Sequence, residues 1–155
     1  MKKVVAVLAP EPRSVIARNL AWVYAAILVV MALGQLYAFE KFIPLISAYG
    51  LPGGETMATV IASLIVFAEI FALPFLLRMR VSPLMRWFSL ACSVIVPATW
   101  IKLSLFALIT NKSLESGALL GAKIEVAVAT QLVIALALLA LALYVAYGLW
   151  PKYKR

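Results

Sequence analysis

Four long apolar stretches occupy most of the 155-residue chain, and each is long enough to cross a bilayer as an α-helix. They run over about residues 20–39, 56–77, 87–109 and 124–149. A hydrocarbon layer ~30 Å thick needs about 20 consecutive apolar residues in a helix. The pattern predicts an all-α fold, an antiparallel four-helix bundle in a membrane. Short connections leave room for one domain only, over residues 1–155.

Composition and charge point to the same class of protein. Hydrophobic residues make up 66% of the chain and charged residues 13%, with a mean hydropathy of +1.07, outside the range of soluble globular domains. The net charge of +8 could indicate nucleic-acid binding. However, the basic residues lie beside the ends of the apolar stretches and form no continuous basic face. We therefore expect the lipid bilayer, and no nucleic acid, as a partner.

The distribution of Lys and Arg predicts the orientation in the membrane. Ten of the 14 basic residues would lie on one side: Lys2, Lys3, Arg13, Arg18, Arg78, Arg80, Arg86, Lys152, Lys154 and Arg155. Only Lys41, Lys112 and Lys123 would lie on the other side, and Lys102 falls within a span. The positive-inside rule then places both termini in the cytoplasm of a multi-pass cell-membrane protein. A cleaved signal peptide is the alternative for the first span, but its apolar core is too long.

The connection between the first two spans, residues 40–55, is unusually apolar. Its residues Phe42, Ile43, Leu45, Ile46 and Tyr49 predict a short interfacial helix with one apolar side, which Gly50 would end. This segment could be a lid over the outer mouth of the bundle. Alternatively it rests on the membrane surface, with its aromatic residues at the interface.

Each span carries one strongly polar residue in a row of small or apolar residues spaced by three and four. The rows are Ala21, Ala25, Leu28, Ala32 and Gln35; Ala58, Ala62, Ile65, Glu69 and Ala72; Ala91, Ile95, Ala98 and Lys102; and Ala127, Gln131, Ala135, Leu138, Ala142 and Ala146. Rows of small residues mark the faces along which membrane helices meet. Gln35, Glu69, Lys102 and Gln131 are therefore predicted to line a polar, ligand-binding cavity inside the membrane, with Glu40, Lys41 and Glu125 at its outer mouth.

A helical rise of ~1.5 Å per residue puts Gln35, Lys102 and Gln131 in one layer and Glu69 deeper. Lys102 then has three possible carboxylate partners, Glu40, Glu69 and Glu125, and the sequence does not choose among them. Glu69 must be protonated, paired or in contact with water, because an unpaired charge at this depth costs at least ~2.5 kcal/mol. The alternative to a cavity is that Glu69 and Lys102 only join helices through polar contacts.

The residue inventory limits the chemistry. With no His and a single Cys, Cys92, the chain alone offers no site for haem, a Cys/His zinc ion or an iron–sulfur cluster. It has no phosphate-binding glycine loop followed by Gly-Lys-Ser or Gly-Lys-Thr. No metal and no cofactor is required by the sequence, and we do not expect the chain to catalyse a reaction on its own.

Part of the chain resembles a known family. The run Phe39-Glu40-Lys41-Phe42, then Tyr49-Gly50-Leu51-Pro52, and then the segment from Phe67 to Leu77 with Glu69 are similar to the DoxX/MauE-like superfamily of small four-helix membrane proteins. The matching features are a Lys near the end of the first span, a Gly-Leu-Pro element and a Glu late in the second span. The resemblance covers about a third of the chain and does not include Lys102.

The resemblance implies an accessory membrane subunit, or partner, of a redox or maturation system. Such a protein would bind a redox or maturation protein and could hold a quinone, a lipid headgroup or another small molecule in its polar cavity. Two other functions remain open from the sequence. One is a small proton-coupled transporter that uses Glu69 and Lys102, and the other is a quinone-reactive oxidoreductase subunit whose partner carries the second redox centre.

Overall fold

A computed structural model describes residues 9–37, 39–49, 53–109, 119 and 127–150. The described part is helical throughout its five main elements: α1 (Val15–Tyr37), α2 (Phe39–Ala48), α3 (Gly54–Leu76), α4 (Pro83–Ile109) and α5 (Val128–Leu149). Four of these helices, all except α2, are long and apolar enough to cross a membrane. The predicted all-α class is confirmed, and so is the presence of four helices suited to a multi-pass membrane protein.

The helix boundaries differ slightly from the predicted ones, for local reasons. Helix α1 begins at Val15 because the Ser14 hydroxyl accepts a hydrogen bond from the Ala17 N–H, at 3.1 Å, and so caps the first turn. Helix α4 begins at Pro83, before the predicted residue 87, because Ser82 caps Met85 in the same way, at 3.2 Å. The predicted start of the fourth span, residues 124–126, lies outside the described residues.

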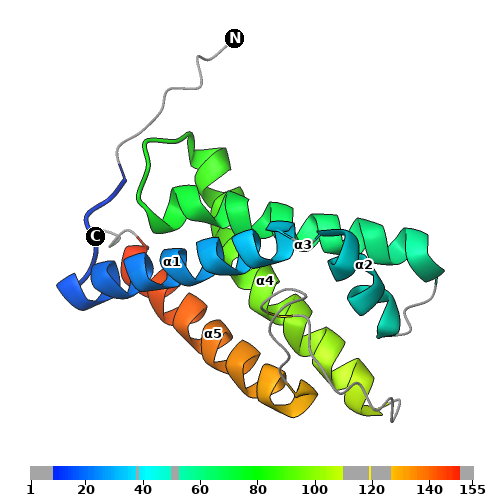
Figure 1. Ribbon diagram of the computed structural model, residues 1–155. Helices are drawn as coiled ribbons and strands as arrows, with labels where there is room; N and C mark the ends of the chain where they lie inside the picture. The colour runs from blue at the N-terminus through cyan, green and yellow to red at the C-terminus, as the bar shows by residue number, and fades with distance from the viewer. Residues whose placement is uncertain (1–8, 38, 50–52, 110–118, 120–126, 151–155) are drawn as a thin grey trace.

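Each of the four long helices packs against two of the other long helices. Helix α3 contacts α1 and α4, and α5 also contacts α1 and α4. Figure 1 shows α1 and α3 side by side, with α4 and α5 crossing them at an angle. Helix α2 packs mainly on α3, near the end where α3 begins.

Small residues allow a close approach between α1 and α5. A Cβ atom on Gly148 would collide with the Cβ atom of Ala17. Close backbone approach of this kind stabilises helix pairs in lipid, where apolar side chains gain nothing by leaving hydrocarbon. At the same end of the molecule, the Arg13 N–H donates to the Gly148 carbonyl at 2.8 Å and so links the segment before α1 to α5.

Basic residues gather at this end. The Arg13 side chain donates to the Trp150 carbonyl at 3.3 Å, and Arg78 donates to the Pro10 carbonyl at 2.9 Å. Arg78 has a positive φ of 54° and ends α3, where the N–H groups of Arg78 and Met79 bond back to the last turn. The beginning of α1 and the ends of α3 and α5 therefore share one end of the fold.

Pro74 lies inside α3, and a side chain of α4 bonds to the helix backbone around it. Pro74 has no N–H, which disturbs the hydrogen bonds of the surrounding turn. The buried hydroxyl of Ser89 accepts from the Phe75 N–H at 2.8 Å and donates to the Ala72 carbonyl at 3.1 Å. A side chain from the neighbouring helix thus satisfies backbone groups that lipid cannot.

Candidate functional site

The centre of the candidate site is a buried pair formed by Gln35 of α1 and Glu69 of α3. Both side chains are completely buried. The Gln35 amide nitrogen donates to Oε1 of Glu69 at 3.0 Å and to the Leu119 carbonyl at 3.3 Å. The small residues that precede them, Ala32 and Ala62 among others, let α1 and α3 approach closely enough for this contact.

Three hydrogen-bonding atoms around this pair lack a partner among the residues that the structure describes. They are Oε1 of Gln35, Oε2 of Glu69 and the indole Nε1 of Trp100 in α4. The Trp100 indole lies close to the Glu69 carboxyl, but its N–H does not reach hydrogen-bonding geometry with it. Buried polar atoms nearly always find a partner, in the protein or in a bound molecule. Two acceptors and one donor in this part of the core are therefore without a partner among the described residues.

A groove on the side of the bundle lies next to this pair. It lies between α1 and α3, has a volume of about 140 Å³, and is lined by Glu69 together with apolar residues such as Ala32 and Ile70. The exposed lining of the groove is entirely apolar, and the completely buried Glu69 is its one ionisable residue. The groove therefore brings an apolar surface, open to the side of the bundle, next to the position of Glu69 between two helices.

Gln131 belongs to a second buried cluster. Its amide nitrogen donates to the Ser104 hydroxyl of α4 at 3.0 Å, and its amide group pairs with the Tyr49 hydroxyl, 3.1 Å from Oε1 and 3.0 Å from Nε2. Tyr49 follows α2 and is completely buried, so its ring is covered by protein. This cluster connects the chain after α2 with α4 and α5.

The predicted position of Lys102 is wrong. Lys102 is exposed on α4, as are Ala91 and Ile95 of its predicted row. The buried face of α4 instead carries Ser89, Cys92, Ser93, Val96, Trp100, Leu103, Ser104 and Ala107. On this helix most small residues of the buried face are serines, and a large tryptophan lies among them, so rows of alanine pointed to the outer face.

The predicted difference in depth between Gln35 and Glu69 does not keep their side chains apart. Gln35 contacts Glu69, which was placed deeper, and Gln131 forms its own cluster. Counting the rise along a helix gives no information on how far neighbouring helices are shifted or tilted. The buried residues predicted for α1 and α3, by contrast, are confirmed: every residue of both rows is buried.

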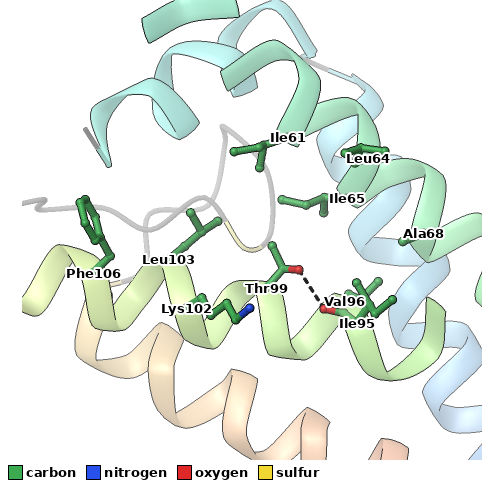
Figure 2. A pocket seen from close by; sticks show the side chains of 10 residues that line it. All are labelled: Ile61, Leu64, Ile65, Ala68, Ile95, Val96, Thr99, Lys102, Leu103 and Phe106. Carbon is green, nitrogen blue, oxygen red and sulfur yellow. Dashed lines mark hydrogen bonds between the residues drawn. The ribbon is translucent and has the colours of Figure 1, made fainter. Parts of the chain in front are cut away.

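Lys102 lies instead in a second groove, between α3 and α4 (Figure 2). No carboxylate among the described residues pairs with it, and Glu125, one of its three predicted partners, lies outside them. A lysine within a membrane span costs about 2.5–3.5 kcal/mol on insertion scales. Its charge therefore needs a partner that the described side chains do not provide.

The other residues predicted at the outer mouth lie on the surface. Glu40 and Lys41 are both exposed, in the first turn of α2. Their charges are free to meet solvent, lipid headgroups or another protein. No group of three or more His, Cys, Asp or Glu residues in the described ranges is placed to hold a metal ion.

Sequence reasoning did not select Trp100, Tyr49 and Ser104 as site residues. Trp100 was missed because an aromatic residue in an apolar span carries no signal of a site until its N–H is seen to lack a partner. Tyr49 and Ser104 belong to segments whose contact is visible only in three dimensions.

Comparisons with known proteins identify no relative. No family model matches the chain, and neither a curated protein nor a solved structure matches it.

Proposed function

We propose that the protein is a multi-pass protein of the cell membrane that acts as a non-catalytic partner of a redox or maturation system. It holds a small lipid-soluble molecule, of the quinone class, beside Glu69. The observation that carries this proposal is the cluster of three unpartnered buried atoms on Gln35, Glu69 and Trp100. The resemblance of Lys41 and Glu69 to the DoxX/MauE-like pattern supports the redox connection.

The chemistry of the cluster fits the head of a quinone or quinol. The Trp100 N–H can donate to a ring carbonyl, and the free oxygens of Gln35 and Glu69 can accept from ring hydroxyls. A molecule that carries both kinds of group in its two redox states matches a site with one donor and two acceptors. The apolar groove between α1 and α3 provides a route for it from the hydrocarbon layer.

The proposed orientation has both termini in the cytoplasm. Its support is the end of the fold at which Arg13 and Arg78 bond to the backbone of neighbouring segments, because cytoplasmic loops collect Lys and Arg. Trp87 and Trp150 pack edge to face there, with ring centroids 4.5 Å apart, as expected of aromatic residues near a membrane interface. Helix α2, with Glu40 and Lys41, would then face the outside and offer charged groups to a partner protein.

Reporter fusions test this orientation. Green fluorescent protein fused after residue 155 should fluoresce, and alkaline phosphatase fused there should be inactive. The same two reporters inserted in the segment before Gly54 should behave in the opposite way. Active phosphatase at the C-terminus would reject the proposed orientation.

Purification in a mild detergent tests the function. We expect mass spectrometry of the intact protein and of its lipid extract to find a quinone and a stoichiometric redox or maturation protein. Glu69→Gln should lose the quinone, whereas Glu55→Gln, a change on the exposed first turn of α3, should keep it. A wild-type protein that carries no quinone, or a quinone content unchanged by Glu69→Gln, would contradict the proposed site.

A further inference from the structure

The groove between α3 and α4 is separate from the Glu69 site and larger. It has a volume of about 420 Å³ and lies between residues 61–68 of α3 and residues 95–106 of α4. This volume is within the range of about 300–1,000 Å³ that is typical of small-molecule sites. Its lining is apolar except for Lys102 and Thr99 (Figure 2). A long hydrocarbon chain would fit against such a surface.

Lys102 is the one charged residue of the lining, and no lining residue is acidic. Figure 2 shows its side chain lying in the groove, with the ammonium nitrogen directed along α4 toward Thr99 and Ile95. It does not extend toward the nearer end of the helix, as lysines do when they reach for the membrane surface. The cation is therefore presented to whatever occupies the groove.

The depth of the Lys102 ammonium group in the membrane limits which molecules could occupy the groove. Lys102 is seven residues before the last residue of α4, Ile109, which places its Cα about 10 Å below that end of the helix. The side chain points further inward, below the level of phosphate headgroups, which lie outside the hydrocarbon layer. A single-chain amphiphile can slide to this depth, but the phosphate of a bilayer lipid cannot.

We propose that this groove binds a single-chain amphiphile with a carboxylate head, such as a long-chain fatty acid. The carboxylate pairs with the Lys102 ammonium, and the chain lies against the apolar side chains of α3 and α4. The occupant provides the negative charge that the described residues do not supply to Lys102. Ala68, which is small, leaves the space that the chain occupies.

The two sites lie on different faces of α3. Ala68 lines this groove and Glu69 belongs to the buried cluster, and consecutive residues of a helix point about 100° apart. Fatty-acid binding therefore does not depend on the proposed quinone site, and either can fail without the other.

A photoreactive analogue of palmitic acid tests the proposal on the purified full-length protein. After irradiation, mass spectrometry should find the cross-link in residues 61–68 or 95–106. Unlabelled palmitic acid should displace the analogue at a concentration about tenfold or more below that of hexadecanol. Only the acid forms a charge-assisted hydrogen bond with Lys102. Phosphatidylglycerol and a short-chain quinone should compete more weakly than palmitic acid.

Four variants distinguish the contribution of the Lys102 charge from that of the free volume in the groove. Lys102→Met should weaken the binding of palmitic acid about tenfold or more and leave the binding of hexadecanol unchanged. Lys102→Arg should keep the preference for the acid. Lys41→Met removes an exposed cation outside the groove and should change nothing. Ala68→Phe should fill the groove and weaken both ligands. Equal binding of acid and alcohol, stronger competition by the quinone or the phospholipid, or cross-links outside the groove would overturn the proposal.

Discussion

Glu69→Gln is the substitution that best separates a binding site from a contact that only joins helices. Glu69 uses one carboxyl oxygen, which accepts from Gln35 at 3.0 Å, while its second oxygen has no partner in the described part of the chain. The glutamine side chain keeps the accepting oxygen and replaces only the second one with an NH₂ group. We expect the free energy of unfolding to change by less than about 0.5 kcal/mol, because the internal hydrogen bond is retained.

Glu69→Leu is the matched change that removes both oxygens. The Gln35 amide nitrogen then has only the Leu119 carbonyl, at 3.3 Å. Loss of the 3.0 Å bond to a buried amide should lower the free energy of unfolding by about 1–3 kcal/mol. Reversible unfolding in mixed micelles of mild and denaturing detergent measures this difference, and the lipid extract of each preparation reports the bound molecule.

Both variants should therefore lose the bound molecule, but only Glu69→Leu should lower the stability of the protein. If Glu69→Gln destabilises the protein as much as Glu69→Leu, the second carboxyl oxygen has a structural partner. The inference that this oxygen is available to a bound molecule is then wrong. If Glu69→Gln retains both the stability and the bound molecule, the carboxyl group serves neither purpose.

Two further predictions concern the packing that positions the site. Ser89→Ala should lower the free energy of unfolding by about 1–2 kcal/mol, because it removes two hydrogen bonds to the backbone of α3 around Pro74. Ser93→Ala is the control, since among the described residues that hydroxyl donates only within its own helix, to the Leu90 carbonyl at 2.7 Å. An equal loss in both variants would refute the role given to Ser89. Gly148→Ala should cost about 1–3 kcal/mol through its collision with Ala17. The double variant with Ala17→Gly should recover most of that loss in the same unfolding assay, and no recovery would show that the collision is not the cause.

The sequence predicts those parts of the fold that follow from hydrophobicity and local spacing. Helices α1 and α3 bury every residue of their predicted rows, because small residues at spacings of three and four are the signal of close helix contact. The short helix α2 was predicted from its apolar side, and its residues Phe42 and Ile46 are buried. These features depend on one helix at a time.

The pairing of polar residues could not be predicted in this way. The contact between Gln35 and Glu69 depends on the relative shift of two helices, which the axial rise does not give. The buried face of α4 was misassigned because Trp100 and three serines occupy it in place of alanines. Leu119, whose carbonyl accepts from Gln35, lies far along the chain from both helices, and no local pattern indicates its role.

The separation of Glu69 from Lys102 has a consequence for both sites. If the two side chains formed an ion pair, each would satisfy the other, and neither would need a further partner. Helix α4 prevents this pairing because it turns Trp100 toward the interior, beside the Glu69 carboxyl, and Lys102 toward the lipid-facing groove. The carboxyl group is thus left with a free oxygen in a buried site, and the ammonium group with no described counter-ion in an apolar groove. Because unpaired polar groups are costly in hydrocarbon, this arrangement is stable when each group meets its own bound molecule, and Glu69→Gln and Lys102→Met should affect different ligands.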